Sequence, residues 1–137
     1  MARSLLIEGL IVMLLPALCI AMDSLKANLR LHSNEQVQSG NGYYSLVMQG
    51  DCNLVLYRVS DSLPLWNSQT AGKGTYCFTF MQGDGNLVVY SGANLPVWSS
   101  GTARLQDDYR LVMQNDGNLV VYTSSNVAIF DTKTVQH

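Results

Sequence analysis

A pattern of twelve residues that occurs three times in register constrains the fold of this 137-residue chain more than any other feature. The copies occupy residues 46–57, 79–90 and 111–122, so that they are spaced 33 and 32 residues apart. An aromatic residue follows each copy, as Trp66, Trp98 and Phe130. A repeat of this length has room for about three or four short strands, and three repeats predict an all-β domain with approximate threefold symmetry.

The residue types within each copy are typical of two strands joined by a tight turn. Val, Leu, Tyr and Phe dominate, with Gly, Asn, Asp and Ser between the apolar segments. The Asp-Gly dipeptides at 84–85 and 116–117 are strong hairpin signals, and Cys52 replaces the glycine in the first copy. No stretch beyond the N-terminal segment has a convincing helical period.

Alternation along a strand divides each copy into a core set and an outer set. After the first turn, Leu54 and Leu56 lie on one face, whereas Asn53, Val55 and Tyr57 share the other. The later copies repeat this alternation. We expect the Leu and Val face to form the core, and we expect the hairpin to bring the preceding Gln and Asp beside the outer set.

The outer set has the chemistry of a carbohydrate site. Gln and Asn donate and accept hydrogen bonds, an ionised Asp accepts them, and Tyr does both. Val supplies a small apolar floor, so the patch suits a sugar, whose hydroxyls would bind most strongly to the carboxylate. Because we find no nucleophile beside a base and no pair of adjacent carboxylates, the patch predicts binding without catalysis.

The same residues also have a purely structural explanation. Asp-Gly-Asn is an ordinary turn sequence, and Tyr and Val are common in strands. Repetition can arise from duplication and shared folding requirements alone. The residues by themselves therefore leave binding and structure open as alternatives.

Composition argues against several other classes of protein. Charged residues make up only 13% of the chain, the net charge is −2, and no basic stripe is present, which argues against binding to nucleic acid. Two His and three Cys leave little material for a metal site, and we expect no cofactor. Residues 83–86 resemble part of a calcium-binding EF-hand loop, but the later acidic ligand and the flanking helices are missing.

Residues 1–22 are predicted to be a secretory signal peptide that is removed. Arg3 lies near the start, an apolar stretch runs from Gly9 to Met22, and cleavage is expected after Ala21 or Met22. A membrane anchor is the alternative, but the uninterrupted apolar run has 14 residues and a spanning helix needs about 20. We therefore expect a secreted or vacuolar domain at residues 23–137, with repeats at about 23–66, 67–98 and 99–137, and no membrane insertion.

Secretion would leave two cysteines, Cys52 and Cys77, in an oxidising compartment. Such a pair is expected to form a disulfide. The alternative is a reactive thiol, which would need an activating His or Lys that the nearby sequence does not offer.

The pattern Gln-x-Asp-x-Asn-x-Val-x-Tyr resembles that of the monocot mannose-binding lectins, also called bulb-type or snowdrop-lectin-like lectins. The resemblance covers residues from about Asp23 to Thr134. It implies the β-prism II fold, in which three four-stranded antiparallel sheets surround a pseudo-threefold axis. It also implies up to three mannose sites that need no metal, and a disulfide between Cys52 and Cys77.

The resemblance implies a role for each motif residue. Asp and Asn would bind the axial 2-hydroxyl of mannose, Gln the 3-hydroxyl and Tyr the 4-hydroxyl, while Val would pack against the ring carbons. The implied mannose-binding residues are Gln49, Asp51, Asn53, Val55 and Tyr57; Gln82, Asp84, Asn86, Val88 and Tyr90; and Gln114, Asp116, Asn118, Val120 and Tyr122.

The chain departs from the family pattern at one position, where Phe130 stands in place of a third central tryptophan. In much of the family the C-terminal strand is exchanged between protomers, so residues 128–134 could support a homodimer or a higher homo-oligomer. The expected function is that of a secreted lectin for defence or storage that recognises terminal α-mannose on high-mannose glycans and glycoproteins. The alternative is a lectin-fold protein with weak or lost sugar binding that recognises a protein partner.

Overall fold

The computed structural model describes residues 5–6, 10–11 and 22–137. Two short strands, β1 (Leu5–Leu6) and β2 (Leu10–Ile11), pair with each other in antiparallel fashion. Most of the predicted signal peptide lies outside the described residues, so that assignment stays a prediction. Within the described residues, no helix has the length and apolar character needed to cross a membrane.

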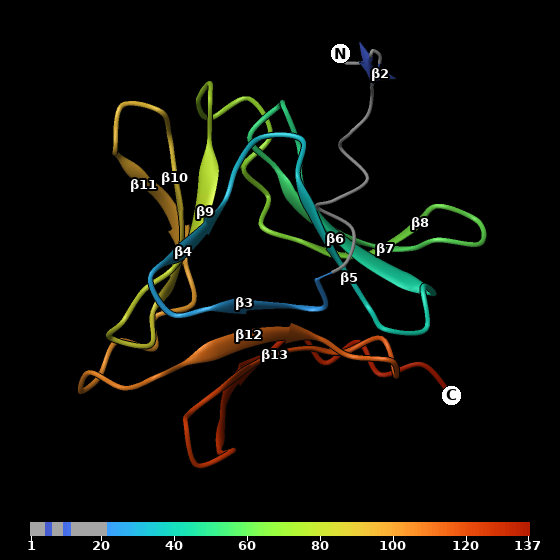
Figure 1. The fold of residues 1–137 in the computed structure, drawn as a ribbon. Coiled ribbons are helices and arrows are strands. Elements are labelled where there is room, and N and C mark those ends of the chain that lie inside the picture. Colours follow the sequence, from blue (N-terminus) through green and yellow to red (C-terminus); the bar gives the residue numbers. More distant parts are fainter. Residues whose placement is uncertain (1–4, 7–9, 12–21) are drawn as a thin grey trace.

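Residues 22–137 form three four-stranded antiparallel sheets, which stand as the sides of a triangular prism (Figure 1). The first sheet contains β5 (Gln36–Gln38), β6 (Tyr44–Met48), β7 (Leu54–Arg58) and β8 (Leu63–Asn67). The second contains β4 (Leu29–Leu31), β9 (Phe78–Met81), β10 (Leu87–Tyr90) and β11 (Pro96–Ser99). The third contains β3 (Ser24–Lys26), β12 (Arg110–Met113), β13 (Leu119–Tyr122) and β14 (Ala128–Asp131). The predicted all-β class and the predicted sheets are confirmed.

Each sheet is built around the hairpin of one sequence copy. The central pairs are β6–β7, β9–β10 and β12–β13, and the strand that follows each hairpin adds to its outer edge. The fourth strand of two sheets comes from elsewhere, because β4 pairs with β9 and β3 pairs with β12. The N-terminal segment thereby closes the second and third sheets, and the sheets do not coincide with the repeats of the sequence.

The strand β14 pairs with β13 of the same chain. The third sheet is therefore complete within one chain. Exchange of residues 128–134 between protomers would replace this pairing with an equivalent one, and it stays a prediction.

The apolar face of every central hairpin is buried, as the alternation of side chains predicts. The fully buried side chains include Leu46, Met48, Leu54, Leu56, Met81, Leu87, Val89, Leu111, Met113 and Leu119. Trp66, Trp98 and Phe130 pack against this core, with ring centroids 5.4 Å apart for the two tryptophans and 5.9 Å apart for Trp98 and Phe130. Phe130 thus keeps the edge-on aromatic contact although it lacks the indole N–H.

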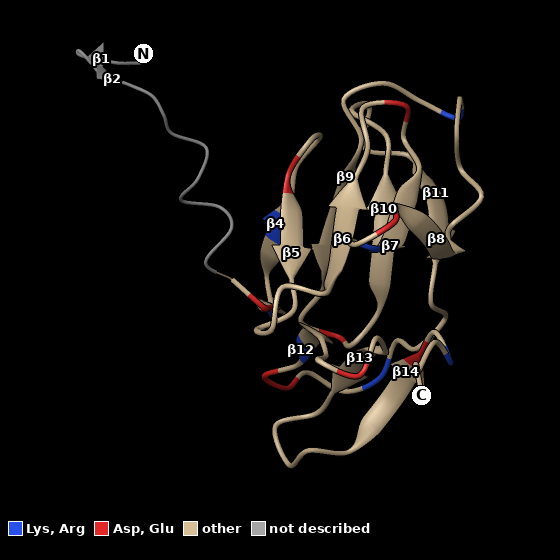
Figure 2. Ribbon diagram, turned by 90° about the vertical axis from the view of Figure 1, so that its right-hand side faces the viewer, with Lys and Arg blue, Asp and Glu red and all other residues tan. Residues whose placement is uncertain are grey.

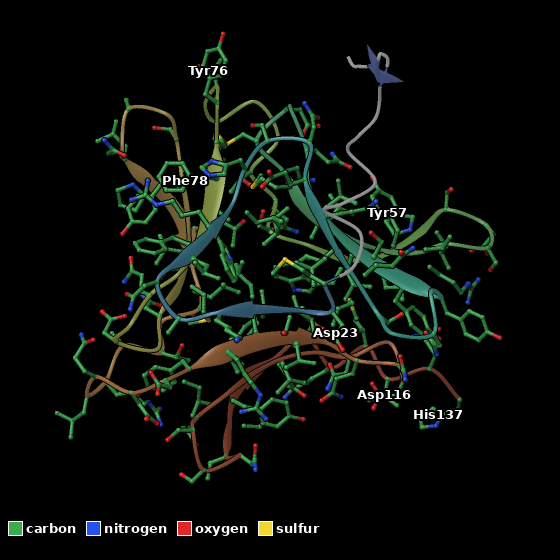
Figure 3. All side chains as sticks on the ribbon, viewed as in Figure 1. Asp23, Tyr57, Tyr76, Phe78, Asp116 and His137 are labelled. Atoms are coloured by element: carbon green, nitrogen blue, oxygen red, sulfur yellow. A yellow bond between two sulfur atoms is a disulfide. The ribbon has the colours of Figure 1, made fainter. Side chains whose placement is uncertain are left out.

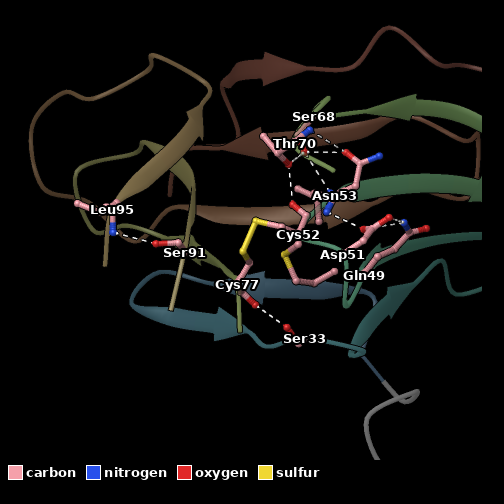
Figure 4. The surroundings of a disulfide bond; sticks show 12 residues. Ser33, Gln49, Asp51, Cys52, Asn53, Ser68, Thr70, Cys77, Ser91 and Leu95 are labelled. Atoms are coloured by element: carbon pink, nitrogen blue, oxygen red, sulfur yellow. Dashed lines mark hydrogen bonds between the residues drawn. A yellow bond between two sulfur atoms is a disulfide. The ribbon is translucent and has the colours of Figure 1, made fainter. Parts of the chain in front are cut away.

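A disulfide between Cys52 and Cys77 links the turn of the first hairpin to the start of the second sheet (Figure 4). This pairing confirms the prediction. Cys52 has a φ of 80°, and the glycines at the equivalent turn positions, Gly85 and Gly117, have φ values of 87° and 91°. The turn therefore requires a left-handed residue in all three copies, and Cys52 adopts a conformation that glycine adopts more readily.

Candidate functional site

The fifteen motif residues form three equivalent patches, one on each sheet. In every patch Gln follows the first strand of the hairpin, Asp lies in the turn, Asn precedes the second strand, and Val and Tyr lie within it. We call the patches site 1, site 2 and site 3 in chain order. Site 1 consists of Gln49, Asp51, Asn53, Val55 and Tyr57, site 2 of Gln82, Asp84, Asn86, Val88 and Tyr90, and site 3 of Gln114, Asp116, Asn118, Val120 and Tyr122.

Hydrogen bonds among the motif residues hold each site in shape. In site 1, the Gln49 side-chain amide donates to both oxygens of Asp51, at 3.1 and 3.2 Å, and accepts a hydrogen bond from the Tyr57 hydroxyl. Sites 2 and 3 repeat these contacts, with amide-to-carboxylate distances of 3.1 and 3.3 Å. Because the side chains already restrain one another, little rotamer freedom remains to be lost on binding.

The carboxylate of each site is also fixed by the backbone. One oxygen of Asp51 accepts a hydrogen bond from the Asn53 amide N–H at 2.9 Å, and the distances in sites 2 and 3 are 3.0 and 2.9 Å. A carboxylate can accept about four hydrogen bonds, so acceptor capacity remains for a ligand hydroxyl. Such a hydroxyl would form a charge-assisted hydrogen bond.

The motif asparagine is oriented by the loop that follows β8, β11 or β14, the strand after the hairpin in each sheet. In site 1, the Asn53 side-chain oxygen accepts hydrogen bonds from the Ser68 hydroxyl at 3.3 Å and the Thr70 amide at 3.1 Å (Figure 4). The equivalent donors are Ser100, Gly101 and Thr102 to Asn86, and Thr132 and Thr134 to Asn118. With its oxygen engaged by the loop, the asparagine directs its NH₂ group, a donor, to the other side.

The loop itself is tied to the hairpin turn. The Thr70 hydroxyl donates to the carbonyl of Cys52 at 2.6 Å and lies 2.7 Å from the Ser68 hydroxyl. Thr102 and Thr134 make the same bond to the carbonyls of Gly85 and Gly117. The sequence prediction did not include these threonines. A signal for them exists, because Ser or Thr followed two residues later by Thr recurs at 68–70, 100–102 and 132–134.

The motif valines lie on the outer face in the expected register but are almost covered. Each valine is 3% exposed. Their partners on β8, β11 and β14 are Asn67 for Val55, Ser99 for Val88 and Asp131 for Val120. The apolar floor predicted from the sequence is therefore recessed between polar side chains.

The three sites differ at the residue that pairs with the motif tyrosine. Tyr57 pairs with Ser45, Tyr90 with Phe78 and Tyr122 with Arg110; Figure 3 labels Tyr57 and Phe78.

The chemistry beside the tyrosine changes accordingly. Phe78 stacks on Tyr90, with ring centroids 5.5 Å apart, and the Arg30 guanidinium lies 4.8 Å from the Phe78 ring centroid. The Arg110 guanidinium lies 5.0 Å from the centroid of Tyr122. The motif residues are alike in the three sites, but the side chain beside the tyrosine is a buried serine in site 1, a buried phenylalanine in site 2 and a partly buried arginine in site 3.

Charged side chains are dispersed over the sheets and loops of the prism (Figure 2). Arg58, the last residue of β7, forms an ion pair with Asp61 in the loop before β8, with 2.6 Å between nitrogen and oxygen. The hydrogen bond from Arg58 lowers the pKa of the Asp61 carboxyl and raises the pKa of Arg58 itself. Across the described part of the chain, no three His, Cys, Asp or Glu side chains are grouped to hold a metal.

A hollow of about 600 Å³ lies between β8, β11 and β14. Trp66, Trp98 and Phe130 line it together with polar residues such as Asn67 and Ser99. None of the fifteen motif residues lines this hollow, so the three sites lie apart from it.

No protein-family model matches the chain. Among curated proteins, the chain is 44% identical over 68 residues to a mannose-specific lectin of Narcissus pseudonarcissus, covering 47% of this chain and 61% of the relative. It is 37% identical over 68 residues to a mannose-specific lectin of Galanthus nivalis, covering 47% of this chain and 42% of the relative. The matched segments thus span less than two thirds of the length of these curated relatives.

Solved structures match over a larger share of both chains. A monomeric monocot mannose-binding lectin from Gastrodia elata superposes with a TM-score of 0.78 at 41% identity, covering 83% of this chain and 99% of that chain. The snowdrop agglutinin from Galanthus nivalis, solved with methyl-α-D-mannoside, gives a TM-score of 0.70 at 38% identity, covering 84% and 99%. The fold is therefore β-prism II, as the family resemblance implies, and the relatives are lectins, which bind carbohydrates and are not enzymes.

Proposed function

Because this chain belongs to the monocot mannose-binding lectin family, we propose that it binds mannose at its three sites and recognises terminal α-mannose on high-mannose glycans. The observation that carries the proposal is the repetition of one hydrogen-bond geometry in all three sites. Each site presents a restrained carboxylate beside an asparagine whose oxygen is held by the protein. Both solved relatives described above are named as mannose-binding, and one was solved with a mannoside.

The pair of Asp and Asn accounts for a preference for mannose over glucose. A hydroxyl placed between them can donate to the carboxylate and accept from the asparagine NH₂ group. In mannose the 2-hydroxyl is axial, and in glucose it is equatorial. A sugar that turns this hydroxyl away would leave both protein groups without their partner, which costs about 1–3 kcal/mol for each buried polar group and less at an exposed site.

Binding at one site is expected to be weak, and multivalency supplies the avidity. A shallow patch exchanges hydrogen bonds to water for hydrogen bonds to sugar, so a monosaccharide Kd in roughly the millimolar range is expected. Three sites on different sides of the prism can engage separate branches of a dense glycan. The proposed partners are therefore mannose-rich glycans and glycoproteins.

The proposed setting is the secretory pathway. Residues 1–22 have the composition of a signal peptide, and the Cys52–Cys77 disulfide fits an oxidising compartment. A secreted or vacuolar lectin for defence or storage fits these features.

The test is a titration of residues 23–137 with methyl α-mannoside, followed through the side-chain amide resonances of the motif Gln and Asn. Methyl α-glucoside and methyl α-galactoside are the control sugars. We expect saturable shifts with the mannoside alone. The variant Asp84→Asn should lose the response of site 2 and retain those of sites 1 and 3, and Tyr76→Ser, far out on an exposed loop, should retain all three. The absence of any shift with all three sugars at tens of millimolar would overturn the proposal and favour a protein partner.

A further inference from the structure

The residue that pairs with the motif valine from β8, β11 or β14 differs among the sites. In the same register, Asn67 faces Val55, Ser99 faces Val88 and Asp131 faces Val120. The third copy alone has a carboxylate at this position.

This carboxylate takes up the donor that the other two sites direct outward. The Asn118 side-chain nitrogen donates to Asp131 at 3.0 Å, while the Asn118 oxygen accepts from Thr132 and Thr134. Among the described residues, no side chain or carbonyl accepts from the corresponding nitrogens of Asn53 and Asn86. In site 1 the Asn67 oxygen instead accepts a hydrogen bond from the Gln69 amide at 2.7 Å.

Burial of the asparagine follows the same difference. Asn118 is only 7% exposed, whereas Asn53 and Asn86 are partly exposed. Asp131 is itself exposed and stands on the same outer face as Val120. The Asn118 oxygen and one of the two N–H groups of its amide nitrogen are therefore engaged within the protein, and a ligand hydroxyl must compete with a carboxylate for this buried donor group.

We propose that Asp131 makes site 3 the weakest of the three mannose sites by engaging an N–H of the Asn118 amide and competing with the sugar for it. This inference rests on the proposed function. A hydroxyl oxygen can accept from Asn53 or Asn86 without competition, whereas at Asn118 it competes with a charged acceptor that already holds one N–H. The position of Asp131 thereby sets an unequal ranking among sites whose motif residues are identical in type.

The test exchanges this residue among the sites, using the residues that the chain already carries. In Asp131→Ser, which copies site 2, we expect the mannoside affinity of site 3 to rise roughly two- to tenfold, the range of one net hydrogen bond. In the reciprocal variant Ser99→Asp, we expect site 2 to weaken by a similar factor. Titration through the side-chain amides reads each site separately, so the unchanged sites serve as internal controls.

Unchanged or weaker binding at site 3 in Asp131→Ser would overturn the inference, and weaker binding would mean that Asp131 itself accepts a hydrogen bond from the sugar. Solvent exchange of the Asn118 NH₂ protons supplies a readout that needs no ligand. It should be slower than the exchange of Asn53 and Asn86 in the unaltered protein and should accelerate in Asp131→Ser. Loss of mannoside binding at all sites would contradict the proposed function, whereas equal exchange rates at the three asparagines would contradict this inference alone.

Discussion

At the scale of single residues, each site depends on a threonine outside the recognition motif. Thr70 is 2% exposed and donates to the Cys52 carbonyl, and its amide holds the oxygen of Asn53. Orientation of the asparagine amide thus comes from a loop 17 residues further along the chain. The orientation of the donor that each site turns outward is thus set by a contact outside the motif.

Replacing Thr70 with Val keeps the shape of the side chain and removes its hydroxyl. The Cys52 carbonyl then loses a buried partner, so we expect the free energy of unfolding to fall by about 1–2 kcal/mol. We also expect mannoside binding to weaken at site 1 and to persist at sites 2 and 3. Urea denaturation and the amide titration measure the two effects. Ser60→Ala, at an exposed position, is the control; a loss of stability with site 1 unaffected would show that Asn53 keeps its orientation without Thr70.

At the scale of elements, the turns of the second and third hairpins combine a left-handed glycine with close packing. A Cβ atom at Gly85 would lie 2.9 Å from the Tyr109 ring and 3.2 Å from the Thr102 carbonyl oxygen. At Gly117 it would lie 3.0 Å from the Thr134 carbonyl oxygen. The turn and the loop that orients the asparagine therefore meet at a point where a side chain has no room.

Gly85→Ala should lower the free energy of unfolding by about 2–4 kcal/mol, because it adds a steric conflict to the cost of a positive φ. Gly42→Ala is the matched control. Gly42 also has a positive φ, 76°, but a Cβ atom there would meet nothing within 4 Å, so only the backbone cost of about 1–2 kcal/mol applies. Equal losses in the two variants, measured by urea denaturation, would contradict the packing argument.

At the scale of the whole molecule, the Cys52–Cys77 disulfide joins the first sheet to the second. The residues it connects are separated by 25 positions, and closing such a loop stabilises the folded state by about 3 kcal/mol in the chain-entropy model. The bond also ends in the turn of site 1, so it restrains the element that carries Asp51.

Cys52→Gly with Cys77→Ser should therefore unfold at a lower urea concentration than the unaltered protein. Glycine is the residue that the other two copies carry at this turn, so its use avoids adding backbone strain. The companion double variant with Ala at position 52 should be less stable again by about 1 kcal/mol, because alanine is strained at a positive φ. Unaltered stability in the glycine variant would show that the folded prism does not depend on the crosslink.

The sequence predicted the parts of this structure that repeat. Alternation placed Leu54 and Leu56 in the core, and the Asp-Gly turns located the hairpins. The fourth strands of the second and third sheets escaped prediction, since β3 and β4 are three residues long and carry no copy of the motif. The contact between Asn118 and Asp131 escaped it as well, because residues thirteen positions apart meet only after the strand register is known.

The closure of two sheets by the N-terminal segment has a consequence for biosynthesis. Residues 24–26 leave the ribosome early, yet their partner in the third sheet, residues 110–112, is made near the end of translation. Nascent β3 must therefore wait, with its edge exposed, while the first sheet can already assemble from residues 36–67. The third sheet thus joins an early strand, β3, to the strands that are translated last. A chain that ends before residue 110 would lack β12, β13 and β14, and β3 would have no partner.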